Sequence, residues 1–338
     1  MRNDTRQAFN QYLARQAQLN GVDSAVQQFA VEPSVQQTLE SQIQESSDFL
    51  NRVNIVGVDE LKGDKIKLGV SGPIASRTDV SANDRQTTDV SSLDDDGYEC
   101  VSTEYDTHIR WAQLDAWAKF RDFQLRLRNQ ILRRQALDRI MIGFNGTSAA
   151  TPTDAGSNPL LQDVNIGWLQ KYRDNAAPYV MEEGGTAGEV RVGPNGDYGN
   201  LDALVYDAAH SLIDPWFREA PGMVAICGRD LLTDKYLPLI NDNEAPTERN
   251  ALEVILSSKR LGGFQAAGVP YFPTNTILLT TFDNLSLYWQ RGARRRYIID
   301  EPKRNRVEHY DSSNDAYVVE EYGAGCLIEN ITIGDFSQ

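Results

Sequence analysis

Residues 112–142 read AQLDAWAKFRDFQLRLRNQILRRQALDRIMI and contain neither glycine nor proline. Apolar side chains recur in this stretch at three- and four-residue spacing, at Trp117, Phe120, Phe123, Leu127 and Ile131. Such spacing places them on one face of an α-helix. With a rise of 1.5 Å per residue, the helix would extend about 46 Å. The sequence therefore predicts a rigid spine, followed by a polar loop that runs to residue 159.

The region after residue 165 mixes two periodicities. Helices are predicted at 167–181, 200–213 and 229–240, and strands at 223–228, 276–282 and 285–290. The segment AYVVEEYGAGCLIENITIG, residues 316–334, alternates polar and apolar residues and predicts a long strand with a bend marked by glycine. Because helices and strands do not alternate as repeated strand–helix–strand units, the pattern indicates an α+β fold.

The N-terminal segment predicts an amphipathic helix over residues 1–28, because Phe9, Leu13 and Ala17 fall on one face. A break at Pro33 separates it from a second predicted helix that runs to about residue 50. The apolar face of the first helix is too small to form a core by itself. We therefore expect this helix to order against a partner, or to pack as a strap on its own subunit or a neighbour.

A strand predicted at 53–58 leads into residues 59–110, where KIKLGVSG and YECVSTEYDTHIRW flank a polar segment. This pattern is typical of a long hairpin with an irregular tip. If each arm uses ~20 residues at ~3.3 Å per residue, the hairpin projects roughly 60 Å. An isolated domain gains little from such an arm, so the sequence predicts that another subunit covers it.

Charge is divided unevenly along a chain whose formal net charge is −15. Nine acidic against two basic residues give −7 between 77 and 106, whereas 112–142 carries +4 and 291–306 carries +5. An acidic arm and a basic spine fit the two halves of a contact between subunits, although each is also compatible with a solvated face. The candidate contact residues are Asp79, Asp84, Asp94, Asp95, Asp96, Arg126, Arg128, Arg133, Arg134, Arg294, Arg295 and Arg296.

No catalytic, cofactor-binding or metal-binding motif emerges from the sequence. It has no phosphate-binding loop and no dinucleotide fingerprint. Its three histidines, His108, His210 and His309, lie far apart without ligand-like neighbours. We therefore predict no catalytic residues, no cofactor and no metal.

Composition also limits where the chain works. Three widely spaced cysteines, with no CxxC pair, argue against a secreted disulfide framework and favour a reducing cytoplasm. The first residues lack the apolar segment of a signal peptide, and no apolar run is long enough to span a bilayer. A strongly acidic balance argues against sequence-specific nucleic-acid binding. We expect no membrane partner.

Long blocks of the sequence resemble a known family, in the family's order and over nearly the whole chain. The blocks are MRNDTRQAFNQYLARQAQLNG, VEPSVQQTLESQIQESSDFLNRVNIV, LDAWAKFRDFQLRLRNQILRRQALDRIMIGFNG, SNPLLQDVNIGWLQKYR, GRDLLTDKYLPLIN, VPYFP and DAYVVEEYGAGCLIENITIGDF. They are similar to the major capsid protein of P-two-like temperate tailed phages.

The resemblance implies the Hong-Kong-97-type capsid fold, with four parts. They are an N-terminal arm at 1–50, an extended loop hairpin at 51–110, a peripheral domain with the spine helix at 111–165 and 294–326, and an axial domain at 166–293 and 327–338.

The resemblance further implies a structural protein of the virion that is assembled in the host bacterial cytoplasm. Family members form hexamers and pentamers in an icosahedral shell around double-stranded DNA, with an internal scaffold that is also a protease and with a portal protein. Trimming of a propeptide at 1–29 is implied too, with Phe29 and Ala30 at the matching position. The alternatives are an acidic cytoplasmic enzyme and a binding module with an unrecognised site, and sedimentation of the purified protein distinguishes them.

Overall fold

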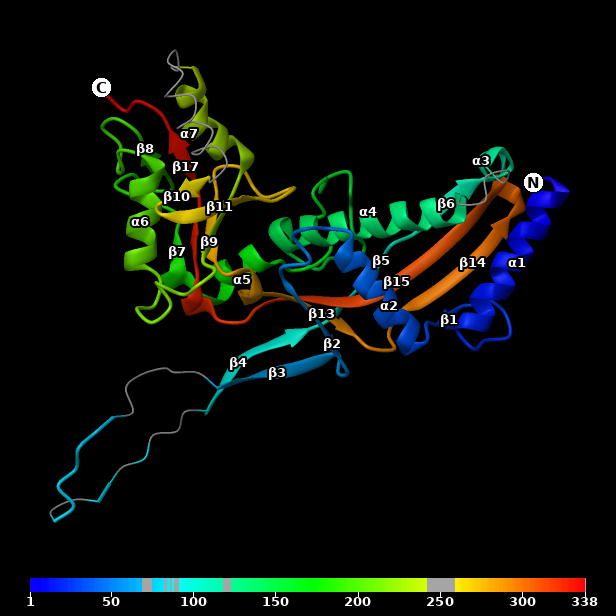
Figure 1. Ribbon diagram of the computed structural model, residues 1–338, viewed down its shortest axis with the longest axis horizontal. Coiled ribbons are helices and arrows are strands. Elements are labelled where there is room, and N and C mark those ends of the chain that lie inside the picture. Colours follow the sequence, from blue (N-terminus) through cyan, green and yellow to red (C-terminus); the bar gives the residue numbers. More distant parts are fainter. Residues whose placement is uncertain are drawn as a thin grey trace.

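The computed structural model describes residues 1–68, 75–81, 84–85, 87, 91–117, 123–241 and 259–337. The subunit is elongated and α+β, with one large sheet toward each end (Figure 1). The fold class predicted from the sequence is therefore the one observed. The two sheets are joined through the middle of the molecule by a long helix and a long strand.

The first sheet is organised around one long central strand, β15 (Arg306–Val319). Its first half pairs with β14 (Arg295–Glu301) and its second half with β13 (Leu285–Gln290), both antiparallel. Its other edge pairs with two short strands, β6 (Thr107–Arg110) and β5 (Val101–Glu104). The sheet ends at β1 (Phe29–Ala30) beside β14 and at β2 (Asn54–Val58) beside β13.

The second sheet has six strands in the order β10-β11-β9-β12-β16-β7. Their bounds are β7 (Val180–Met181), β9 (Val224–Cys227), β10 (Arg260–Leu261), β11 (Phe264–Gly268), β12 (Ile277–Thr280) and β16 (Cys326–Ile328). Helix α6 (Leu201–Ser211) packs its apolar face on this sheet. A separate ribbon, β8 (Val190–Val192) with β17 (Ile331–Ile333), joins the same core, and α7 (Arg229–Asn241) follows β9.

The remaining helices lie along and beyond the first sheet. They are α1 (Asn3–Leu19), α2 (Pro33–Glu45), α3 (Trp111–Trp117), α4 (Phe123–Asn145) and α5 (Trp168–Asn175), with short 3-10 helices at Ala177–Tyr179, Phe282–Asn284, Pro302–Arg304 and Tyr322–Ala324. The predicted spine is observed as α3 and α4, and its continuity at 118–122 lies outside the described residues.

The face that α4 buries differs from the predicted one. Its second half buries Leu132, Ala136, Ile140 and Phe144 against the core. The apolar stripe recognised in the sequence continues through Leu127 and Ile131, which are only half-buried. The side chains of two other members of this stripe, Phe120 and Phe123, lie outside the described part of the chain. The helix therefore carries two apolar stripes, and only the second one faces the core.

Trp168 on α5 holds the middle of the subunit together. Its side chain is fully buried, with ring centroids 5.2 Å from Phe144 and 5.2 Å from Tyr317 and 6.0 Å from Phe49. Its indole N–H donates to the carbonyl of Ser286 at 2.9 Å. One side chain thus joins α4, α5, β13 and β15, because aromatic edges and a satisfied N–H both favour this site.

A hairpin does form at the predicted place, from β3 (Lys62–Leu68) and β4 (Ser91–Glu99). It lies outside both large sheets (Figure 1). Residues 101–110, which we assigned to the hairpin, instead form β5 and β6 of the first sheet. The 60 Å reach depends on 69–74, 82–83, 86 and 88–90, which lie outside the described residues.

Two other expectations differ from the structure, because strands pair with segments that are distant in the sequence. Strand β13, which we placed with the axial domain, pairs with β15 and β2 in the first sheet. The long strand predicted at 316–334 is divided into the end of β15, a 3-10 turn, β16 and β17. The predicted bend is at Gly325, where a Cβ would lie 2.5 Å from the Tyr172 hydroxyl.

We expect Gly143→Ala to destabilise the subunit by about 1–3 kcal/mol, because it overpacks a filled core. A Cβ at this position would lie 2.2 Å from the ring of Trp168, which is fully buried and has no room to move. On an exposed helix face the same change would stabilise. Urea unfolding of dispersed subunits measures the effect, with Asn129→Ala on the exposed face of α4 as the control. A stabilised Gly143→Ala variant would contradict this packing.

Candidate functional site

Five charged side chains form a buried cluster at the centre of the first sheet. They are Glu40 on α2, Arg139 on α4, Arg294 directly before β14, and Asp311 and Asp315 on β15. Arg294 Nη1 lies 2.9 Å from Glu40 Oε1, and its Nη2 lies 2.7 Å from Asp311 Oδ2. Arg139 binds Glu40 at 2.5 Å and Asp315 at 3.1 Å. The cluster therefore links two helices to two strands.

The arginines determine how the carboxylates titrate. Burial alone would raise the pKa of Asp311, but Arg294 and Arg296 lower it well below its usual range. Burial opposes ionisation of Glu40 too, yet Arg139 and Arg294 leave its pKa lowered. Burial raises the pKa of Asp315 despite the ion pair with Arg139. Each charge is stabilised only by its partners, so removal of one partner leaves another charge buried and unpaired.

One of the predicted contact residues, Arg294, belongs to this buried cluster. The side chain of Arg294 is 1% exposed and bound inside its own subunit, so it is not available to a neighbour. Two residues further along the chain, Arg296 binds Asp311 at 3.0 Å, and Arg295 donates to the carbonyl of Gly292 at 2.6 Å. Much of the positive charge of residues 291–306 is therefore bound within the subunit.

Sequence reasoning also missed the acidic members of the cluster, although a signal was present. Glu40 falls in the apolar stripe of α2, with Leu39 and Ile43 beside it. Asp311 and Asp315 follow the two-residue period of the inward face of β15. A charged residue inside an apolar period requires a buried partner of opposite charge. That rule predicts buried basic partners for these acids, and the structure identifies them as Arg139 and Arg294.

The arginines of α4 behave as predicted in one respect, because Arg126, Arg128, Arg133 and Arg134 are all exposed. Arg134 also forms an ion pair with Asp138 at 2.5 Å. A set of guanidinium groups therefore lies on the outer face of the helix. Arg139, two turns beyond Arg133 toward the C-terminal end, points inward instead.

The acidic candidates of the hairpin lie at its tip and on one strand. Asp79 and Asp84 are exposed. The backbone of Asp94 pairs with Lys65 across the β3–β4 ladder, and Asp95 and Asp96 follow it on β4. At the base of the hairpin, Lys62 Nζ lies 2.7 Å from Glu99 Oε1. Lys62 on β3 therefore offsets the negative charge of Glu99 at the base of the hairpin.

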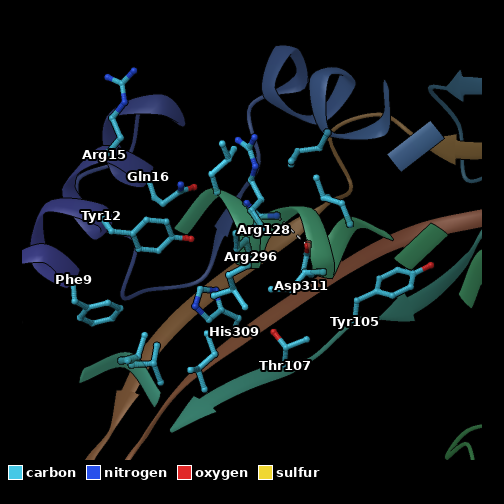
Figure 2. A pocket seen from close by; sticks show the side chains of 18 of the residues that line it. Phe9, Tyr12, Arg15, Gln16, Tyr105, Thr107, Arg128, Arg296, His309 and Asp311 are labelled. Carbon is cyan, nitrogen blue, oxygen red and sulfur yellow. Dashed lines mark hydrogen bonds and ion pairs between the residues drawn. The ribbon is translucent and has the colours of Figure 1, made fainter. Parts of the chain in front are cut away.

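Helix α1 lies over the outer end of the first sheet and closes one side of a cavity of about 590 Å³. Figure 2 shows Tyr12 turned toward β14, β15 and α4, whereas Arg15 points away. The ring of Tyr12 lies 6.2 Å from that of His309. Arg6 forms an ion pair with Asp300, and the backbone N–H of Arg2 donates to Asp115 at 2.8 Å. In this subunit α1 is a strap on its own sheet.

The predicted cleavage position lies where this strap enters the sheet. Phe29 is buried in the core and pairs with Arg296, whereas Ala30 is exposed. The three residues before Phe29 are exposed. Val31 continues the contact, since its N–H donates to the carbonyl of Arg294 at 3.0 Å. A protease would reach 26–28 directly but would have to free Phe29 from the sheet.

His309 lies beneath α1 among mostly positive groups. Burial and the charge of Arg296 lower the pKa of His309 to about 4, although Asp311 opposes the shift. Arg128 lines the same cavity. The imidazole is therefore neutral at pH 7, and its protonated form is disfavoured while α1 is seated.

The described part of the chain contains neither a metal-binding cluster nor a membrane-spanning helix. No group of three or more histidine, cysteine, aspartate or glutamate side chains there is placed to hold a metal ion. None of its helices is both long and apolar enough to cross a bilayer.

Comparison with solved structures identifies the class of protein to which this subunit belongs. A capsid chain from the satellite phage P4 procapsid that includes the size determination (Sid) protein matches with a TM-score of 0.83 and 49% identity, covering 100% of both chains. Two sheets joined by a spine helix, an N-terminal strap and a protruding hairpin thus define a phage capsid subunit of the Hong-Kong-97 type. Such a subunit is a structural component of the virion and forms a shell from copies of itself.

The sequence comparisons identify the family. Residues 8–331 match the family model for the phage major capsid protein, P2 family. The capsid protein of Escherichia phage P2 is 53% identical over an alignment of 346 residues, covering 100% of this chain and 97% of the relative. The major capsid protein of Serratia phage KSP20 is 43% identical, covering 98% of each. The chain belongs to the P2 family of phage major capsid proteins, which are structural proteins and not enzymes.

We expect Arg294→Met to lower the free energy of unfolding by about 3–5 kcal/mol, because it leaves Glu40 and Asp311 without a buried partner. Arg133→Met, at an exposed position of α4, is the matched control and should change stability by less than about 0.5 kcal/mol. Urea unfolding of the dispersed subunit measures both. Equal effects in the two variants would show that the cluster does not stabilise the fold.

We expect acid to weaken the subunit through His309. Its folded pKa of about 4 lies below the ordinary value of 6.5, so the unfolded or opened chain takes up the proton first. Stability is therefore lost as pH falls below 6.5 and the loss levels off near 4, with about 2 kcal/mol lost between pH 7 and 5.

His309→Gln should remove that part of the pH dependence, which urea unfolding at pH 7 and pH 5 measures. His108→Gln is the control, because His108 is exposed on β6. If both substitutions leave the same loss between pH 7 and 5 as the parent, His309 is not its source.

Proposed function

We propose that this capsid protein assembles as hexamers and pentamers into the icosahedral head that encloses the double-stranded DNA of a tailed phage. Membership of the P2 major capsid family is the observation that supports this architecture. The division into an N-terminal arm, an extended loop, a peripheral domain and an axial domain belongs to the same proposal. The β3–β4 hairpin, outside both sheets, is the element with most to gain from a neighbouring subunit.

The contact between subunits joins the acidic hairpin of one copy to the exposed arginines on the α4 helix of the next. Supporting this are the exposed Asp79 and Asp84 and the exposed Arg126, Arg128 and Arg133. Arg294 is excluded because it is buried. Single exposed pairs contribute only ~0–1 kcal/mol, so the contact depends on many pairs repeated around each ring.

Three further partners belong to the proposal: an internal scaffold that is also a protease, a portal protein, and packaged DNA bound without sequence specificity. The P4 procapsid structure includes a size determination protein, which makes an accessory assembly factor plausible for this chain as well. Residues 1–29 serve assembly and are removed at Phe29-Ala30. A net charge of −15 keeps contacts with DNA few and local.

A charge swap tests the contact. Reversal of Asp94, Asp95 and Asp96 to Lys should abolish or slow particle formation while the subunit still folds, because like charges then face each other. Reversal of Arg126, Arg128 and Arg133 to Glu should have the same effect. Particles are detected by sedimentation and electron microscopy, and folding by urea unfolding.

The combination of both sets of reversals is the decisive sample. It should restore particles, at least in part, because the pairs are re-formed with exchanged signs. Glu182→Lys with Glu183→Lys, two exposed acids elsewhere, controls for a general effect of added positive charge. Normal particles from either single set of reversals would eliminate the proposed contact.

A further inference from the structure

The apolar stripe on the first half of α4 has no complete cover within the described subunit. Leu125 is 51% exposed, and Leu127 and Ile131 are half-buried. All three line the cavity beneath α1, as do Phe9 and Tyr12 of α1 itself. Apolar side chains of both α1 and α4 therefore border the same cavity.

The size of this cavity suits part of a peptide. Its volume of about 590 Å³ lies within the ~300–1,000 Å³ typical of binding sites. Its walls are the helices α1 and α4, and its floor includes Ile109 of β6 and Val307 of β15. A groove between two helices accepts the apolar face of a third, which inserts side chains at spacings of three, four and seven residues.

The charge around the groove selects the sign of the occupant. Arg128 on α4 is exposed and lines the cavity, whereas Arg15 on α1 borders the cavity with its guanidinium pointing away. The acidic residue of the lining, Asp311, is already bound by Arg294 and Arg296. His309 is neutral at pH 7. Carboxylates on an occupant would therefore meet the guanidinium group of Arg128 and no unpaired acid of the lining.

The geometry points to a docking groove for an acidic amphipathic helix of a second protein, with its apolar face between α1 and α4 and its carboxylates on Arg128. The inference rests on the proposed function in one respect, since it names the chemistry by which an assembly partner would recognise the subunit. The α1 helix of a second copy does not fit, because Arg2, Arg6 and Arg15 outnumber its one acid, Asp4.

Binding is measured on dispersed full-length subunits, so that it is independent of particle formation. The probe is a fluorescein-labelled synthetic helix of about four turns, with Leu on one face and Glu on its flanks. A second probe carries Lys in place of every Glu. Fluorescence anisotropy should show the Glu probe binding at least about tenfold more tightly than the Lys probe.

Two variants probe the groove itself. Leu125→Glu places a charge in the apolar wall and should weaken the Glu probe at least about tenfold. Arg128→Glu should weaken the Glu probe and strengthen the Lys probe, each about three- to tenfold. Arg133→Glu is the matched control, because Arg133 is exposed on the same helix but does not line the cavity, and should change neither affinity.

Three results would overturn the inference. Equal binding of both probes would mean that charge does not select the occupant. An equal loss in Arg128→Glu and Arg133→Glu would mean general attraction to a basic helix. A photo-crosslinker at Leu125 that in assembled particles joins only to residues 75–81 of another copy would make a second subunit the occupant. Normal particles after reversal of Arg126, Arg128 and Arg133, with Glu-selective probe binding intact in the unaltered subunit, would leave the groove in place and reject the shell contact instead.

Discussion

The buried ion cluster of Glu40, Arg139, Arg294, Asp311 and Asp315 is the constraint on which the subunit depends. A buried guanidinium tolerates little displacement, because each lost hydrogen bond leaves a charge in a low dielectric. The cluster therefore sets the rotation of α4 about its axis and the position of α2 on the sheet. It also fixes where β14 begins beside β15. Apolar packing around Trp168 stabilises the same region but would tolerate more variation in position.

Local periodicity predicted which segments form helices and strands, but it did not predict which strands pair with each other. The helix at 200–213 and the strands at 276–282 and 285–290 are present as α6, β12 and β13. A strand has the same alternation in either sheet, so nothing local could place β13 beside β15 and β2. The apolar stripe of α4 was ambiguous for a related reason. Two stripes fit a helical period, and only the arrangement of the sheet decides which one is buried.

The proposed contact surface was predictable only where a charged residue of the sequence is also exposed in the fold. Arg126, Arg128 and Arg133 are exposed as expected, whereas Arg139 and Arg294 carry the same formal charge and are buried. A count of charges cannot separate these cases, because the pairing acids come from distant segments: Glu40 lies 99 residues from Arg139. The function itself followed from ordered sequence blocks that resemble a family, and composition alone would not have identified it.

Segregation of charge along α4 would allow one helix to serve both the core and the proposed contact with a neighbouring subunit. Toward its C-terminal end Arg139 is bound inside the subunit, and toward its N-terminal end the arginines face outward. Changes at the outer residues leave the buried cluster intact, since sites without shared partners act nearly independently. The strap α1 adds a second adjustable surface, because it covers the outer end of the sheet without filling the space beneath it. The contacts that we propose with partners therefore use the parts of the subunit that its core does not need.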